Sequence, residues 1–209
     1  MTNIINMYFD YITIRDIIQV EGEDNMIICL CGKSGCGKST VANEIMKNNP
    51  NSIHVDIDKI GHNSHSDEKV KKELIIIFGN QILTNNTIDR KKLGKIVFQD
   101  KEEMKKLEDI TWNYMEKQID KIINNNKDKL IILDWQLLPK TKYFNDSNLK
   151  ILIDVPYEIR KQRTLMRDNI TEEQFNLRES ASINYDKSKF DFVVSDNNEI
   201  IKKKVFKYE

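Results

Sequence analysis

The sequence lacks several features that would indicate a particular class of function. Its 33 basic residues are balanced by 33 acidic residues, so the formal net charge at pH 7 is zero. A nucleic acid held mainly through its phosphates is therefore not an expected partner. No apolar run reaches the length of a membrane span, and the N-terminus has no basic segment followed by an apolar one. We expect a cytoplasmic protein with no membrane partner.

Cysteine and histidine are also scarce. The three cysteines, Cys29, Cys31 and Cys36, lie too close together in the sequence to form a disulfide. We interpret them as free thiols of a reducing compartment, with Cys36 alone exposed enough to react. His62 and His65 have the spacing of zinc ligands, but no second Cys or His pair accompanies them, so zinc is not expected.

Short apolar segments of strand character alternate with helical patterns, and neither a repeat nor a linker divides the chain. We expect an N-terminal extension (residues 1–25) and one domain (residues 26–209), in which 67–126 form a charged helical lobe, to which the family resemblance described below assigns acceptor binding, and 157–185 form a helical lid. The alternation predicts an α/β fold with a mostly parallel sheet covered on both faces. The five expected strands are residues 26–31, 52–57, 130–133, 149–154 and 192–195.

The most specific motif is Gly-Lys-Ser-Gly-Cys-Gly-Lys-Ser-Thr at residues 32–40. Its spacing matches the phosphate-binding P-loop, G-x-x-x-x-G-K-S/T, between an expected strand and an expected helix. Glycines let the backbone curl so that N–H groups point at phosphate oxygens. Lys38 would reach the β- and γ-phosphates, and the Ser39 hydroxyl would bind Mg²⁺. The sequence therefore predicts a nucleotide-binding protein whose loop residues are Gly32, Gly35, Cys36, Gly37, Lys38, Ser39 and Thr40.

Acidic residues are expected at the carboxyl ends of two strands, where open α/β sheets bind ligands. Asp56 and Asp58 alternate, so we expect them to share a strand face. A kinase needs a carboxylate to accept the proton of the attacked hydroxyl. An Asp at a strand end is often only a turn or helix cap, but two in alternation after the loop favour a functional role. We favour Asp58 as this base and Asp56 as the residue that orients the acceptor or contacts Mg²⁺ indirectly, although the order of the two stays open. Asp134 is a candidate metal ligand.

Three arginines follow the fourth expected strand. Arg160, Arg163 and Arg167 are spaced to lie along one side of a helix. Such a row can be a solvated basic face, or it can clamp a phosphoryl group or stack on a base. Because the row follows a strand, we favour contact with the phosphoryl group or the base for Arg163 and Arg167 over a solvated face. A break near Asn169 should precede a second helix capped by Thr171.

These motifs together resemble the dephospho-CoA kinase family over roughly residues 26–200. The resemblance implies a P-loop kinase core that uses Mg²⁺ and transfers the γ-phosphoryl group of ATP to the ribose 3′-hydroxyl of dephospho-CoA. It also implies that Arg167 stabilises the transferring charge and that Asp89, Arg90 and Leu93 belong to the acceptor side. The matching segments are 32–40, 55–60 (Val-Asp-Ile-Asp-Lys-Ile), 78–79 (Phe-Gly), 88–98 (Ile-Asp-Arg-Lys-Lys-Leu-Gly-Lys-Ile-Val-Phe), Asp134 with Leu137-Leu138, and Arg163-x-x-x-Arg167-Asp168.

The chain departs from the family pattern mostly on the acceptor side. Thr111-Trp112 replaces the usual His-Pro, and Gln136 replaces the Pro before Leu137-Leu138. Cys31 and Ser182 replace a usual Thr and Gln. Two alternatives stay open: a related P-loop kinase acting on a nucleoside, nucleotide or other small hydroxyl compound, and a non-catalytic protein that responds to nucleotides.

Overall fold

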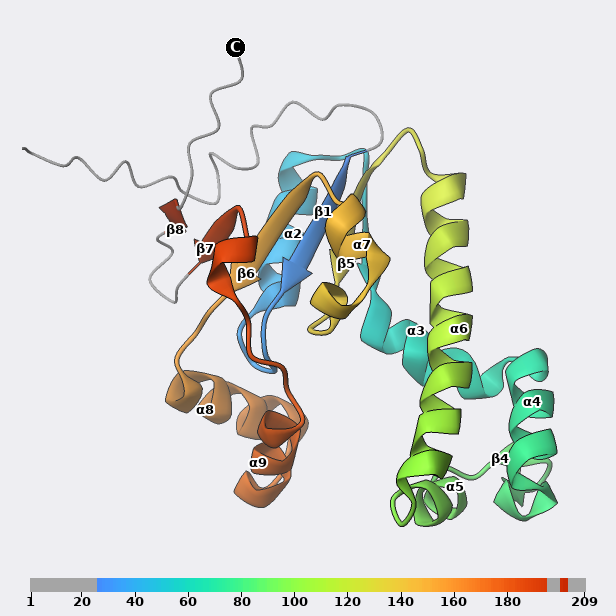
Figure 1. The fold of residues 1–209 in the computed structure, drawn as a ribbon. Helices are drawn as coiled ribbons and strands as arrows, with labels where there is room; N and C mark the ends of the chain where they lie inside the picture. The colour runs from blue at the N-terminus through green and yellow to red at the C-terminus, as the bar shows by residue number, and fades with distance from the viewer. Residues whose placement is uncertain (1–25, 195–199, 203–209) are drawn as a thin grey trace, which may run out of the picture. The chain divides into compact units, whose positions relative to one another are not determined.

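The computed structural model describes residues 26–194 and 200–202, which include a six-stranded β-sheet (Figure 1). Within these residues the strand order is β2-β5-β1-β6-β7-β8. β1 pairs in parallel with β5 and with β6, and β6 pairs in parallel with β7. The strands are β1 (Ile27–Cys31), β2 (Ser52–Asp56), β5 (Leu130–Asp134), β6 (Leu149–Ile153), β7 (Phe192–Val194) and β8 (Ile200–Lys202).

The mostly parallel α/β sheet predicted from the sequence is confirmed, with one strand more than expected. The additional strand, β8, pairs antiparallel with β7 at the edge of the sheet. The strand prediction ended at residue 195 and assigned no strand to residues 200–202. The predicted N-terminal extension, residues 1–25, lies outside the described residues.

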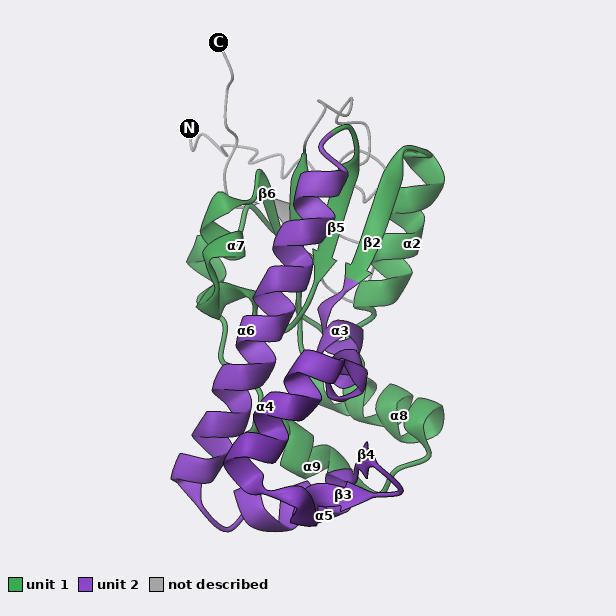
Figure 2. Ribbon diagram, turned by 90° about the vertical axis from the view of Figure 1, so that its right-hand side faces the viewer, with its two compact units in different colours: residues 1–55, 128–209 green, residues 56–127 purple. Residues whose placement is uncertain are grey.

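The chain divides into two compact units (Figure 2). The first consists of residues 1–55 and 128–209 and contains the sheet. The second consists of residues 56–127. The helices of the first unit are α2 (Lys38–Asn48), α7 (Lys142–Asp146), α8 (Tyr157–Asp168) and α9 (Glu172–Ser180).

The central strand, β1, is covered on both faces. Leu30 is fully buried in an apolar cluster that includes Ala42 and Ile45 of α2. The neighbouring Cys29 points the other way, and its thiol donates a hydrogen bond to the carbonyl oxygen of Tyr143 in α7. Because alternate side chains of a strand point to opposite faces, α2 and α7 lie on opposite sides of the sheet (Figure 1).

The second unit is mainly helical, and aspartates cap four of its helices. Asp56, Asp67, Asp89 and Asp100 each accept at least one hydrogen bond from a backbone N–H group of the helix that follows. The helical pattern predicted for residues 67–126 is present, but a short hairpin interrupts it. The elements are α3 (Ile57–Asn63), α4 (Glu68–Phe78), β3 (Leu83–Thr84), β4 (Thr87–Ile88), α5 (Arg90–Val97) and α6 (Lys101–Asn125).

The sequence prediction missed the β3–β4 hairpin. Its turn residues, Asn85 and Asn86, have φ angles of 49° and 59°. Asparagine tolerates this left-handed conformation, which two-residue hairpin turns require. In the sequence, the Asn-Asn pair was the feature that could have indicated this turn.

The break between α8 and α9 occurs where the sequence predicts it. Asn169 ends α8 in the left-handed conformation, with φ 50° and ψ 46°. Thr171 caps α9 and forms a capping box with Gln174. Both predictions for this connection are confirmed.

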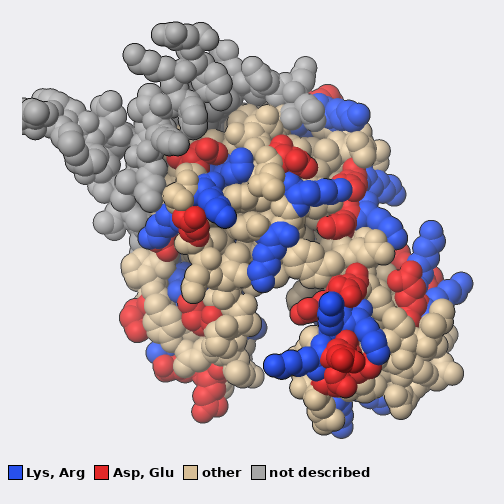
Figure 3. Space-filling view, viewed as in Figure 1, with Lys and Arg blue, Asp and Glu red and all other residues tan. Residues whose placement is uncertain are grey.

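The surface reflects the balanced composition. Figure 3 shows acidic and basic side chains intermingled over the face in view. Among the described helices, none combines the length and the apolar character that a membrane crossing requires.

Candidate functional site

A Gly-rich loop (residues 32–37) joins β1 to α2. Gly32, Gly35 and Gly37 have φ angles of 152°, 78° and 98°. Side chains of L-residues rarely permit such values, so the curl of the loop depends on glycine at these positions. The strand–loop–helix arrangement predicted from the motif is confirmed.

The backbone of the Gly-rich loop is packed tightly against its neighbours. A Cβ atom at Gly32 would lie 2.7 Å from the carbonyl oxygen of Ile153 at the end of β6. A Cβ atom at Gly35 would lie 2.4 Å from both the carbonyl oxygen of Arg160 and the Oγ1 of Thr164 in α8. No side chain could be added at either glycine without moving β6 or α8.

Lys38, the first residue of α2, turns back over the loop. Its Nζ donates a hydrogen bond of 3.0 Å to the carbonyl oxygen of Gly32 and lies 3.9 Å from the Oδ1 of Asp134. The N-cap residue Gly37 has no side chain that could cap α2. An ammonium group and an uncapped helix N-terminus at one place form a setting that suits phosphate oxygens.

Asp134, the last residue of β5, is a buried carboxylate with two partners. Its side chain is 7% exposed, and its Oδ2 lies 3.1 Å from the Nε2 of His54 in β2. A buried carboxylate is costly unless it is paired, and Lys38 and His54 supply the compensation. Sequence reasoning gave His54 no role, because its contact arises only when β2 and β5 lie side by side.

The prediction that Cys36 is exposed enough to react is wrong. Cys36 is 3% exposed, and its Sγ lies 2.5 Å from the point that a Cβ at Gly32 would occupy. Burial raises the pKa of the Cys36 thiol, and it raises the pKa of Cys29 to about 11. All three cysteines are free and buried, so they act as small apolar residues of the core.

The expectation that Asp56 and Asp58 share a strand face is also wrong. β2 ends at Asp56, and α3 begins at the next residue. Asp56 caps this helix, with its Oδ1 accepting a hydrogen bond of 3.0 Å from the N–H of Lys59. Asp58 instead lies in the first helical turn. Local alternation could not reveal this change from strand to helix, and the catalytic roles of the two residues stay predictions.

The three arginines of α8 have different surroundings. Arg160 is only 5% exposed, whereas Arg163 and Arg167 are exposed. Arg167 donates from Nε to the Oδ1 of Asp168 at 2.7 Å, and Arg178 of α9 also pairs with Asp168. Hydrogen bonds, first from Arg167, lower the pKa of Asp168 to about 2.

Glu179 of α9 joins the Gly-rich loop to the two helices. Its Oε1 accepts a hydrogen bond of 2.8 Å from the Nζ of Lys33 in the loop. The Nη1 and Nη2 of Arg160 donate to the same carboxylate at 2.8 and 3.0 Å. These hydrogen bonds, first that of Arg160, lower the pKa of Glu179 to about 2. No motif contains this cluster, and sequence reasoning missed it.

The residues expected on the acceptor side already have local partners in the second unit. Asp89 caps α5 and accepts a hydrogen bond from the hydroxyl of Thr84, which lowers its pKa. Arg90 donates to the carbonyl oxygen of His62, and Leu93 is 2% exposed in the apolar core. Packing accounts for Leu93 without a ligand, and a role for these residues in acceptor binding stays a prediction.

No set of three or more His, Cys, Asp or Glu residues that could hold a metal ion occurs within residues 26–194 and 200–202. The Nδ1 of His65 is buried without a hydrogen-bond partner. Burial, together with the charges of Arg90 and His62, lowers the pKa of His65.

Comparison with known proteins decides the family. The model of the family described as dephospho-CoA kinase matches residues 26–202. The chain belongs to the dephospho-CoA kinase family. A dephospho-CoA kinase from Aquifex aeolicus is 39% identical over 154 residues, which cover 72% of this chain and 77% of that protein. The resemblance inferred from the motifs is therefore confirmed.

Solved structures agree with this family. A dephospho-CoA kinase from Campylobacter jejuni matches with a TM-score of 0.53 and 25% identity, over 81% of this chain and 87% of that one. The crystal structure of TT1252 from Thermus thermophilus has the same fold, with a TM-score of 0.70 and 23% identity over 83% of this chain and 90% of that one.

We predict that Gly35→Ala destabilises this family member much more than Gly37→Ala. Both substitutions strain a left-handed backbone, which costs about 1–2 kcal/mol. Only the first also forces a methyl group onto α8, since nothing lies within 4 Å of a Cβ at Gly37. Overpacking of this kind adds about 1–3 kcal/mol. Equal free energies of unfolding for the two variants, measured with urea, would contradict the packing seen at Gly35.

The lowered pKa of Glu179 predicts a pH-dependent contribution to stability. Because the folded-state pKa is about 2 and the ordinary value is 4.5, the contribution is complete above pH 4.5 and disappears as the pH falls toward 2. The free-energy difference between the wild type and Glu179→Gln, measured by urea unfolding, should therefore shrink between about pH 6 and about pH 3. If the free-energy difference between the two proteins stays constant over this pH range, the prediction is wrong.

Proposed function

We propose that this protein transfers the γ-phosphoryl group of ATP to the ribose 3′-hydroxyl of dephospho-CoA. The observation that supports this most directly is the Gly-rich loop, with Lys38 folded back over it and Asp134 buried beside Lys38. Together with membership of the dephospho-CoA kinase family, this geometry favours a phosphoryl donor held at the N-terminus of α2.

On the donor side, the loop backbone at Gly32, Gly35, Cys36 and Gly37 would hold the phosphates. Since the side chain of Cys36 is buried, only its backbone can contribute. Lys38 would neutralise the charge that builds up on the β- and γ-phosphates. Arg163 and Arg167 of α8 would bind the nucleotide and stabilise the transferring group, for which Arg167 would have to exchange its partner Asp168.

The residues beside Lys38 fit a magnesium ion. Mg²⁺ prefers oxygen ligands, and the chain offers the exposed hydroxyl of Ser39 and the carboxylate of Asp134. The pair His54–Asp134 fixes one carboxylate oxygen, and the other faces Lys38. When bound, the ion would neutralise phosphate charge, while the protein residues position the reactants.

On the acceptor side, Asp58 would accept the proton of the 3′-hydroxyl. The hydroxyl oxygen forms the new bond to the γ-phosphorus, the bond from that phosphorus to the bridging oxygen breaks, and ADP leaves with the electron pair. Asp56 would orient the acceptor, a role that suits a carboxylate already fixed by the N–H of Lys59. Asp89 and Arg90 would bind other parts of the acceptor.

The direct test is an assay that couples ADP release to an optical signal. We expect ATP consumption to depend on dephospho-CoA and to exceed the rates with a panel of nucleosides and nucleoside monophosphates. Lys38→Ala should abolish the signal, since it removes the cation beside the loop. A clear rate with another acceptor and none with dephospho-CoA would overturn the proposal in favour of a related P-loop kinase.

The roles of the two aspartates give a second prediction. Asp58→Asn should lower kcat by ~10²–10⁴, because a positioned base contributes this much to proton transfer. The Kd for ADP, measured by calorimetry, should change little. Asp56→Asn should raise the KM for the acceptor more than it lowers kcat. If the large loss of kcat appears in Asp56→Asn instead, the roles are reversed.

A further inference from the structure

We propose that Glu179 is a positioning residue for the Gly-rich loop. Together with Arg160 it holds Lys33–Gly35 against α8 and α9 before the nucleotide arrives. This inference rests on the proposed function, because it concerns the loop that would bind the ATP phosphates. We call the group Lys33, Glu179 and Arg160 the loop brace.

The loop brace connects three separate parts of the first unit. Lys33 belongs to the loop, Arg160 to the first turn of α8 and Glu179 to the last turn of α9. The Glu179 carboxylate receives three hydrogen bonds of 2.8 to 3.0 Å, one from Lys33 and two from Arg160. Since one carboxylate serves both cations, the position of the loop depends on the position of α9.

Arg160 is anchored on its other side as well. Its Nε donates to the carbonyl oxygen of Val155 at 2.9 Å, and its Nη1 lies 3.4 Å from the carbonyl oxygen of Ser34 in the loop. The guanidinium is nearly inaccessible to solvent, with 6% of its side chain exposed, and the Glu179 side chain is 19% exposed. Ion pairs that exclude solvent to this degree are screened less than surface pairs, so they can hold a loop in place.

The backbone of the loop lies directly on the same helix. Gly35 approaches the carbonyl oxygen of Arg160 and the hydroxyl of Thr164 so closely that a Cβ would be 2.4 Å from each. The Oγ1 of Thr164 is buried and has no hydrogen-bond partner. The brace therefore acts at a point where the loop and α8 are already in contact.

The consequence concerns binding of the nucleotide phosphates. A loop that is held in its curled form loses less conformational entropy when its N–H groups bind phosphate. Without the Glu179 charge, Lys33 and Arg160 lose their shared partner, and the loop must be ordered by the ligand itself. We expect weaker nucleotide binding and an unchanged affinity for the acceptor.

The experiment measures the Kd of ADP by calorimetry in four proteins: wild type, Glu179→Gln, Lys33→Met and the double variant. Glu179→Gln should raise the Kd about tenfold, the size expected when a ligand must order several loop residues. Lys33→Met, which leaves Arg160 paired with Glu179, should raise it by a smaller factor. The double variant should bind as weakly as Glu179→Gln alone, because both changes interrupt one linkage.

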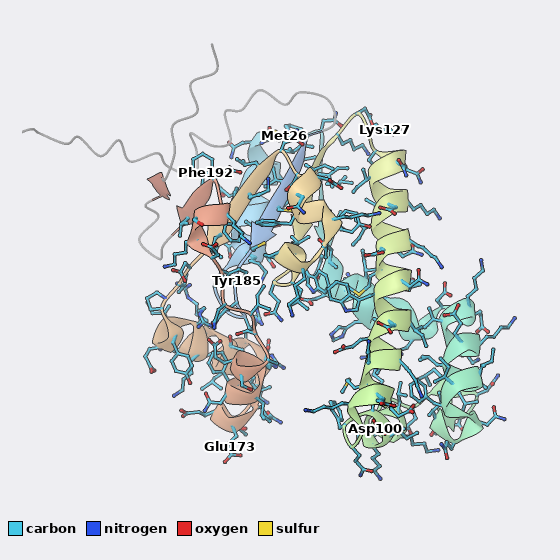
Figure 4. The ribbon with its side chains drawn as sticks, in the orientation of Figure 1. Met26, Asp100, Lys127, Glu173, Tyr185 and Phe192 are labelled. Atoms are coloured by element: carbon cyan, nitrogen blue, oxygen red, sulfur yellow. The ribbon has the colours of Figure 1, made fainter. Side chains whose placement is uncertain are left out.

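Two controls separate the loop brace from a general effect on stability. Glu173→Gln removes a charge from the other end of α9 (Figure 4) and should leave the Kd unchanged. In the coupled assay, Glu179→Gln should raise the KM for ATP without raising the KM for dephospho-CoA. A loss of helix packing alone would lower the melting temperature and leave the ADP affinity of Lys33→Met unaltered.

The outcomes also distinguish this inference from the proposed function. If the wild type binds ADP and Glu179→Gln binds it equally well, the loop brace is wrong and the proposed function stands. Additive effects of Lys33→Met and Glu179→Gln would show that Lys33 acts on the phosphates directly, which also overturns the brace. If the wild type does not bind ADP, both the brace and the proposed function fail.

Discussion

The close approach of a glycine backbone to a helix is the constraint on which the candidate site depends. At Gly35 the loop contacts the backbone of α8 at a distance that no other residue would allow. This contact brings the first turn of α8 against the loop, so that Arg160 reaches the carbonyl oxygen of Ser34. From there Arg160 and Lys33 share Glu179, and α9 is tied to the same point. The arrangement of the loop, α8 and α9 therefore depends on the absence of a Cβ atom at Gly35.

Buried charged groups near the loop are paired with residues from other helices and strands. Asp134 and Arg160 are both nearly buried, and isolated buried charges are strongly unfavourable. Each is paired with residues of other elements: Asp134 with His54 and Lys38, and Arg160 with Glu179. These pairs form only when strands and helices have assembled. The site is therefore a product of the folded unit and not of the loop alone.

Local features were predictable because their causes are local. The loop glycines, the break at Asn169 and the cap at Thr171 follow from backbone preferences of single residues, and the structure has them where the sequence indicates. The errors had two sources. Tertiary packing buries Cys36. The helix that contains Asp58 and the turn at Asn85 and Asn86 had local signals, namely the capping side chain of Asp56 and the Asn-Asn pair, which the strand pattern did not reveal.

The amino-acid sequence by itself determined the mostly parallel α/β sheet, the Gly-rich loop between β1 and α2, and the family. These follow from hydrophobic patterning and from residues whose chemistry depends on close spacing. Only the tertiary structure decided the partners of Asp134, the distinction between Arg160 and the other arginines of α8, and the partners of Glu179. The reason is physical: polar contacts between residues 80 or 146 positions apart leave no periodic pattern in the sequence. They form only after the chain has folded and brought these residues within a few ångströms of each other.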